Sequence, residues 1–254
     1  MCTLIVLRRP DHPWPIIFGA NRDEMLNRPW RPPARHWPDR ADVVAGLDEL
    51  AGGTWMGLNE AGLVACILNR HGALGPAPDK RSRGELVLEA LDHADAVEAA
   101  KALSAIDPNA YRPFNLVVAD NRDAWWLALT AIGQETGAGV RVEKIPAGLS
   151  MFTAGERNDP KDGRIARYLS AFEAAAAPDP DADDWAAWQQ LLGARAGDPP
   201  NAMSFRMASG FGTSSSALVA LPSVATAHAK PPKRPVWLFA PGTPDVTAFL
   251  PVAL

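Results

Sequence analysis

The amino-acid sequence predicts an α+β fold in which mainly antiparallel sheets are covered by helices. Short apolar runs typical of strands alternate in blocks with helical patterns, in the order strands, helices, strands, helices, strands. A doubly wound parallel sheet would instead alternate strand and helix strictly. The 254 residues, 47% of them hydrophobic, are enough for a single domain over residues 1–254 with a large core.

The first half of the sequence contains two expected pairs of strands. The apolar runs Thr3–Leu7 and Ile16–Ala20 are separated by a proline-containing break, which predicts strand, turn, strand. Residues 27–40 are rich in proline and predict an irregular loop. Gly53–Leu58 and Leu63–Leu68 follow as two further strands, joined by a segment of Asn and Gly that favours a hairpin.

The first expected helix has a start signal. Ser82 is placed as an N-cap, with Glu85 three residues later completing a capping box for a helix over Arg83–Leu91. The other expected elements are helices over 95–103, 165–176 and 185–192 and strands over 116–119, 124–129, 140–145, 149–153, 215–221 and 236–239.

Composition excludes several classes of function. The net charge of −4 and the scattered basic residues argue against a nucleic-acid partner. No run approaches the length of a membrane helix, and no signal peptide is visible. The two cysteines, Cys2 and Cys66, are too few for a disulfide framework and favour the reduced cytoplasm. None of the five histidines has metal-ligand spacing, so we expect no metal. The cysteine chemistry described below implies no cofactor. The oligomeric state stays open.

Cys2 is the first candidate for chemistry. If the initiator methionine is removed, Cys2 gains a free α-amino group, whose ordinary pKa is about 8. A thiol beside its own amine combines nucleophile and base, because the amine can take the thiol proton through a water molecule. The alternative is that Cys2 is simply the first residue of a strand.

The polar segment Asn21-Arg22-Asp23-Glu24 is the second candidate, since it directly follows an apolar strand. A carboxylate here could orient the α-amine, and Arg22 could hold an anionic group of a substrate. The alternative is a solvated turn with an internal ion pair.

A third candidate segment runs from Gly52 to Arg70. Asn69 ends an expected strand, where its amide could stabilise a developing oxyanion. Asn69 could equally be a turn-forming residue. Trp55 is placed in the core or in the wall of a substrate pocket, and Arg70 is grouped with the substrate-binding candidates.

Together these segments resemble the NRDE family, the Transport and Golgi organization protein 2 family. The resemblance rests on Met1-Cys2-Thr3-Leu4, Asn21–Glu24 and Gly52–Gly57. Weaker matches are Ser82-Arg83-Gly84, Phe114-Asn115-Leu116 and Gly212-Thr213-Ser214-Ser215-Ser216. It runs nearly end to end and implies an N-terminal-nucleophile (Ntn) hydrolase-like fold, a four-layer αββα sandwich of two mainly antiparallel sheets.

The chain is more distantly similar to cholylglycine hydrolase and penicillin V acylase. Their Gly-Arg-Asn-x-Asp pattern falls on Gly19–Asp23, which places Asp23 on the carboxylate that supports the nucleophile, while Ala20 replaces the arginine. Their Asn-Glu-x-Gly-Leu and Leu-Asn motifs match this chain and place Asn69 on the oxyanion-hole asparagine. Their second such asparagine has Asn158 as its candidate here.

These resemblances imply a cysteine hydrolase acting on a non-peptide amide, or a related acyl bond, of a small molecule. Cys2, Asp23 and Asn69 would be catalytic. The residues placed at the substrate are Asn21, Arg22, Glu24, Trp55, Arg70 and Asn158. The alternative is a non-catalytic carrier, because the family is linked to haem handling and to acyl-CoA or lipid metabolism. Haem would then be bound cargo.

Overall fold

The computed structural model describes residues 2–130, 139–199 and 201–254. They form two compact units. The first comprises Met1–Arg28 and Pro146–Ala253, and the second Pro29–Ile145 with Leu254. We describe each unit by itself, and the prediction of a single domain over residues 1–254 stays a prediction.

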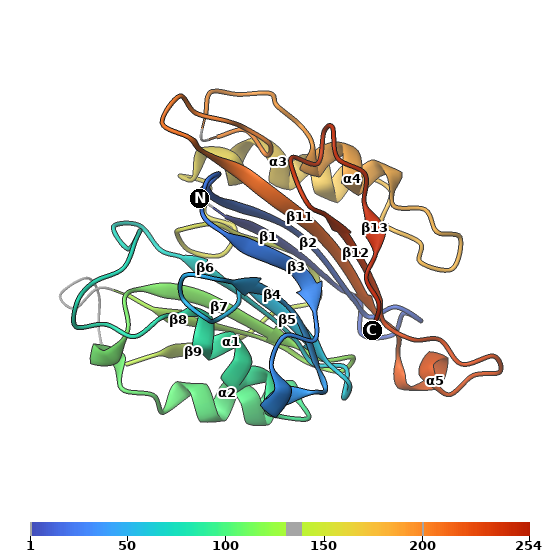
Figure 1. Cartoon of the computed structure of the whole chain (residues 1–254). Coiled ribbons are helices and arrows are strands. Elements are labelled where there is room, and N and C mark those ends of the chain that lie inside the picture. Colours follow the sequence, from blue (N-terminus) through green and yellow to red (C-terminus); the bar gives the residue numbers. More distant parts are fainter. Residues whose placement is uncertain (1, 131–138, 200) are drawn as a thin grey trace. The chain divides into compact units, whose positions relative to one another are not determined.

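The first unit is built on a six-stranded sheet of order β10-β1-β2-β11-β12-β13, in which all neighbouring strands are antiparallel. Helices α3 and α4 pack together over one face of this sheet (Figure 1). The strands are β1 (Thr3–Arg8), β2 (Ile16–Met25), β10 (Gly148–Phe152), β11 (Phe211–Leu221), β12 (Val236–Ala240) and β13 (Leu250–Pro251), and the helices are α3 (Gly163–Ala174), α4 (Ala186–Leu192) and the short α5 (Val224–Ala227).

A buried apolar cluster fixes α3 and α4 onto this sheet. Ile17 of β2, Phe172 of α3 and Trp188 of α4 all belong to it, and the rings of Phe172 and Trp188 meet edge to face at 5.3 Å. Trp188 lies directly on Gly19, where a Cβ would stand 3.0 Å from Cε3 of the indole. A glycine at this position therefore allows α4 to approach β2 closely.

The second unit is built on a seven-stranded antiparallel sheet of order β3-β4-β5-β6-β7-β8-β9. Helices α1 and α2 cover one of its faces (Figure 1). The strands are β3 (Trp30–Ala34), β4 (Val43–Asp48), β5 (Met56–Asn59), β6 (Val64–Asn69), β7 (Phe114–Ala119), β8 (Ala124–Leu129) and β9 (Arg141–Lys144), the α-helices are α1 (Gly84–Leu91) and α2 (Ala96–Ser104), and two 3₁₀ helices, η1 and η2, cover Pro38–Arg40 and Pro108–Ala110.

Two glycines bring the segment before β5 against the start of α1. A Cβ on Gly53 would stand 2.6 Å from the carbonyl carbon of Gly84, and the backbone N–H of Thr54 donates to the carbonyl of Gly84 at 3.1 Å. Two of the segments that carry the family resemblance, Gly52–Gly57 and Ser82–Gly84, therefore meet in the structure.

The expected strands are largely present, but β2 is longer than its apolar run. It continues to Met25 because the polar residues after Ala20 remain paired, with β1 opposite Asn21 and with β11 as far as Met25. The prediction that Asn21–Glu24 lies after the strand is therefore wrong. The predicted loop over 27–40 also contains β3, which pairs with β4.

The predicted capping box at α1 is not formed. The N-cap residue is Arg83, which makes no side-chain cap bond. Glu85 instead accepts a hydrogen bond from the Tyr111 hydroxyl and pairs with Arg81 at 2.6 Å. Within the part of the chain that the structure describes, every helix is too short or too polar to span a membrane.

Candidate active site

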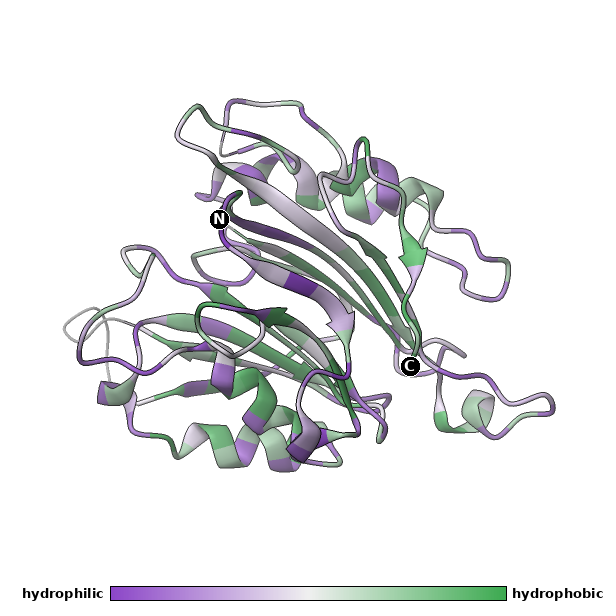
Figure 2. Cartoon of the chain, in the orientation of Figure 1, coloured by the Kyte–Doolittle hydropathy of each residue, from purple (hydrophilic) through white to green (hydrophobic). Residues whose placement is uncertain are grey.

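Polar segments of β2 and β11 lie side by side in the first unit. In both strands one half is apolar and the other polar, and the antiparallel register brings the polar halves together. Figure 2 shows this sheet green toward one end of its strands and purple to white toward the end that holds the N-terminus. A β-bulge occurs at Ser214. The paired residues are Asp23 with Thr213, Arg22 with Ser215 and Asn21 with Ser216.

Cys2 lies at this polar end, one residue before β1. Its Sγ accepts a hydrogen bond from the backbone N–H of Asp23 at 3.4 Å and lies 3.6 Å from the Asp23 carbonyl oxygen, to which it donates. Burial raises the pKa of the Cys2 thiol above its ordinary value, and the negative charge of Asp23 raises it further. The thiol is therefore held in its neutral form and needs a base before it can attack a carbonyl.

The Asp23 carboxylate is fully buried and held by two side chains. Nη1 of Arg164 donates to Oδ2 at 2.8 Å, and the Thr213 hydroxyl donates to Oδ1 at 2.9 Å. Nη1 of Arg164 also lies 2.5 Å from Oγ1 of Thr3, the residue after Cys2. Arg164 thus ties Asp23 to the strand that begins beside the nucleophile.

Arg164 was missed by sequence reasoning, since an arginine in an amphipathic helix is usually solvated. It lies in the first turn of α3, whose N-cap Asp162 accepts from the backbone N–H of Arg164 at 2.9 Å. A cation is unfavourable at this end of a helix dipole. An arginine two residues after an Asp N-cap is therefore the signal that could have marked a buried partner for a carboxylate.

Arg22 and Glu24, which are both predicted to contact the substrate, lie in the second half of β2. Arg22 is buried, and its Nη1 donates to Oγ of Ser214 at 3.0 Å, while that hydroxyl donates to the Arg22 carbonyl at 3.0 Å. Glu24 lies near the end of β2, where its Oε1 accepts from the backbone N–H of Met25 at 2.7 Å. Arg22 is thus a second buried cation at the polar end of the sheet, besides Arg164.

Asn21 and Asn158 use their side-chain amides within the first unit. Nδ2 of Asn21 donates to the carbonyls of Leu192 and Met203 at 2.9 and 2.8 Å. Oδ1 of Asn158 accepts from the backbone N–H of Met151 at 2.6 Å, and the Asn158 backbone has a positive φ of 54°. These bonds join Asn21 to the end of α4 and Asn158 to the edge strand β10.

Asn69, Arg70 and Trp55 belong to the second unit. Asn69 ends β6 opposite Phe114, whose side chain lies in the core beneath α1 and α2. Nη1 of Arg70 donates to Oδ1 of the buried Asn115 at 2.8 Å. Trp55 meets the Trp30 ring edge to face at 5.7 Å. Asn69 thus ends β6, Arg70 follows it directly, and Trp55 lies in an aromatic pair.

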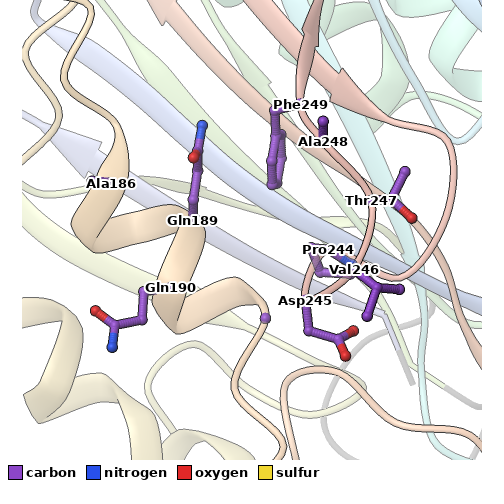
Figure 3. Close-up of a pocket in the computed structure, with 10 residues that line it drawn as sticks. Ala186, Gln189, Gln190, Pro244, Asp245, Val246, Thr247, Ala248 and Phe249 are labelled. Atoms are coloured by element: carbon purple, nitrogen blue, oxygen red, sulfur yellow. The ribbon is translucent and has the colours of Figure 1, made fainter.

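A separate pocket of about 680 Å³ opens in the first unit between α4 and the segment 244–249 (Figure 3). Gln189 and Gln190 of α4 line one side, and Asp245, Thr247 and Phe249 line the other. It contains none of the predicted site residues. Among the described residues, no group of three or more His, Cys, Asp or Glu side chains is arranged to hold a metal ion.

Solved structures with a similar fold include three hydrolases. An N-acylethanolamine-hydrolyzing acid amidase ortholog from Caenorhabditis elegans is 14% identical, with a TM-score of 0.59 over 85% of this chain and 92% of that one. Penicillin V acylase from Agrobacterium tumefaciens is 14% identical, with a TM-score of 0.57 over 94% and 83%. A conjugated bile acid hydrolase from Clostridium perfringens is 10% identical, with a TM-score of 0.52 over 100% and 97%.

At these identities the likeness shows the fold alone. It confirms the fold class predicted from the sequence, α+β with two mainly antiparallel sheets of the Ntn-hydrolase-like kind.

The sequence itself is similar to the mouse Transport and Golgi organization 2 homolog, with 37% identity over 111 residues. That match spans 41% of this chain and 38% of the mouse protein, well under half of either. Residues 1–171 match the family Transport and Golgi organisation 2, which covers Cys2, the Asn21–Glu24 segment, Asn69 and Arg164. The predicted resemblance is confirmed, and the chain belongs to the Transport and Golgi organisation 2 family.

Proposed function

We propose that this protein is a cysteine N-terminal-nucleophile hydrolase that cleaves a non-peptide amide, or a related acyl bond, of a small molecule. The observation that carries the proposal is the position of the Cys2 thiol, 3.4 Å from the backbone nitrogen of Asp23 at the polar end of the sheet. The solved structures of similar fold are named as an amidase, an acylase and a hydrolase, which supports the same class of reaction.

The proposed reaction begins with removal of Met1, which frees the α-amine of Cys2. The amine takes the thiol proton through a water molecule, and the thiolate adds to the substrate carbonyl carbon. The resulting tetrahedral oxyanion is stabilised by hydrogen-bond donors, a role that we propose for Asn69. The amine then returns the proton to the leaving nitrogen, and water hydrolyses the thioester to regenerate Cys2.

The neutral thiol makes the α-amine necessary in this proposal. Because burial and Asp23 raise the thiol pKa, little thiolate is present at neutral pH while Met1 blocks the amine. We propose that Asp23, anchored by Arg164, fixes the backbone that the thiol contacts and orients the freed amine. Arg22, Arg70 and Trp55 are the proposed substrate contacts, and the reaction is proposed for the cytoplasm.

The experiment combines intact mass with a substrate screen. Protein purified from its own host should lack the initiator methionine. It should hydrolyse at least one member of a panel of N-acyl amides, an activity that Cys2→Ala abolishes. Cys66→Ala is the matched control, because Cys66 is buried in β6 and takes no part in the reaction. A methionine that is retained, or an activity that survives Cys2→Ala, would contradict the proposal and favour a carrier of haem or an acyl-CoA-like or lipid-like ligand.

A further inference from the structure

Ser215 in β11 carries a buried hydroxyl that makes no hydrogen bond to any residue that the structure describes. Its residue is 1% exposed, and its Oγ has no hydrogen-bond partner within residues 2–130, 139–199 and 201–254. The neighbouring hydroxyls are both bonded. Ser214 contacts Arg22, and Ser216 donates to the Ala20 carbonyl at 2.9 Å. A buried hydroxyl without a partner costs about 1–3 kcal/mol, so an explanation is required.

The strand registers place Ser215 in one row with the nucleophile. Ser215 pairs directly with Arg22, one residue after the bulge at Ser214. Thr3 pairs with Asn21, so extending the β1–β2 register by one residue places Cys2 opposite Arg22. Directly opposite residues share a face of the sheet and have Cβ atoms about 4.5–5.5 Å apart. Cys2, Arg22 and Ser215 therefore form a row across three strands, about 9–11 Å long.

The chemistry of this row suits an anionic group. A serine hydroxyl can donate to an oxygen, and an adjacent guanidinium adds positive charge and further N–H donors. Bulges re-aim side chains next to active sites, and this bulge separates Ser215 from the paired Thr213. A carboxylate on the substrate would give the Ser215 hydroxyl the partner that it lacks within the described residues.

We propose that Ser215, together with Arg22, binds a carboxylate of the substrate on the side of Arg22 away from Cys2. The inference rests on the proposed function for the position of the cleaved bond. It narrows the substrate class to amides that carry an acidic group several bonds from the carbonyl carbon. A neutral amide of the same size could still accept a hydrogen bond from Ser215, but it would lack the negative charge that favours the site beside Arg22.

The test measures binding by titration calorimetry in a Cys2→Ala background, where no turnover occurs. The probes are N-hexanoyl-4-aminobutyrate and its neutral primary amide, which differ only in the terminal charge. We expect the carboxylate probe to bind at least tenfold more tightly than the amide. Adding Ser215→Ala should weaken the carboxylate probe roughly tenfold, the usual effect of losing a hydrogen bond to a charged group. It should weaken the amide probe less, because a hydrogen bond to a neutral carbonyl is roughly half as strong.

Ser216→Ala is the matched control on the next residue. Ser216 makes bonds to the Ala20 carbonyl and to Oδ1 of Asn21 at 2.6 Å, so its loss should lower the Tm and leave the preference for the carboxylate intact. Ser215→Ala should keep or raise the Tm, because it removes an unpartnered hydroxyl. This contrast separates a ligand role from a structural one.

Three results would overturn the inference: equal binding of the two probes, binding of neither probe, or a Ser215→Ala variant with an unchanged preference. The outcome is distinguishable from failure of the proposed function. A carboxylate preference without hydrolysis by Cys2-intact protein overturns only the hydrolase. Hydrolysis without a carboxylate preference overturns only the role of Ser215.

Discussion

Replacing Arg164 by methionine tests whether its ion pair with Asp23 holds the polar end of the first sheet. The two side chains are 2% and 0% exposed, and Nη1 lies 2.8 Å from Oδ2. Methionine fills part of the space but leaves the carboxylate buried without its guanidinium. Removing one partner of a buried pair costs about 3–5 kcal/mol. In a protein of this size the loss corresponds to a fall in Tm of roughly 6–20 °C.

Urea unfolding followed by tryptophan fluorescence measures this loss, with Arg31→Met as the control. Arg31 pairs with Glu49 at 2.6 Å, but the two side chains are 62% and 33% exposed. Removing an exposed pair of this kind costs at most about 1 kcal/mol. Combining Asp23→Leu with Arg164→Met should restore much of the stability, because no unpaired charge stays buried. Equal losses for Arg164→Met and Arg31→Met would refute the reasoning.

Three further predictions follow from local geometry. In a Cys66→Ala background that retains the initiator methionine, the rate of Cys2 alkylation should rise with a midpoint at a higher pH than the midpoint for an unstructured cysteine peptide. The reason is that burial, and then a nearby carboxylate, raise the pKa of the thiol. A midpoint at or below that of the peptide contradicts this. Gly53→Ala should lower the free energy of unfolding by about 1–3 kcal/mol, because the added Cβ would stand 2.6 Å from the backbone of α1. Gly139 faces open space, so Gly139→Ala should change the free energy of unfolding by less than about 0.5 kcal/mol. Asn158→Ala should lower the free energy of unfolding by about 1–3 kcal/mol, because it removes a hydrogen bond to β10 and places alanine at a positive φ. The KM for any substrate should stay unchanged. A raised KM in a fully stable variant would assign Asn158 to the substrate instead.

The sequence predicted the elements of this fold better than the connections among its polar residues. Apolar runs such as Thr3–Leu7 identify strands because periodicity and side-chain type are local properties. The end of β2 was misplaced because Asn21–Glu24 is polar, and its pairing with β11 depends on residues almost two hundred positions away. Local propensity cannot report such partners.

The same limit applies to the candidate site. The approach of Cys2 to Asp23 was expected, because the resemblance to cholylglycine hydrolase and penicillin V acylase places Asp23 on the carboxylate that supports the nucleophile. Arg164 was not foreseen, since its pairing with Asp23 spans 141 positions and depends on how α3 packs on the sheet. The bonds of Asn21 and Asn158 to backbone groups were also not foreseen, because the sequence does not mark such partners, and their places at a substrate stay predictions.

The Asn21–Glu24 segment reads as one motif in the sequence, but the strand divides it between two faces. Asn21 bonds to the carbonyl of Leu192 at the end of α4, and Asp23 bonds to Arg164 of α3, so both face the helices. Successive residues of a strand point to opposite faces, so Arg22 points away from the helices, to the side of Ser215. Asn21 and Asp23 therefore lie on the helix-covered face, and under the proposed function Arg22 is the member of the motif that we propose to meet a ligand. A substitution in this motif should accordingly affect stability or binding according to the face on which it falls, and not according to its distance from Cys2 along the chain.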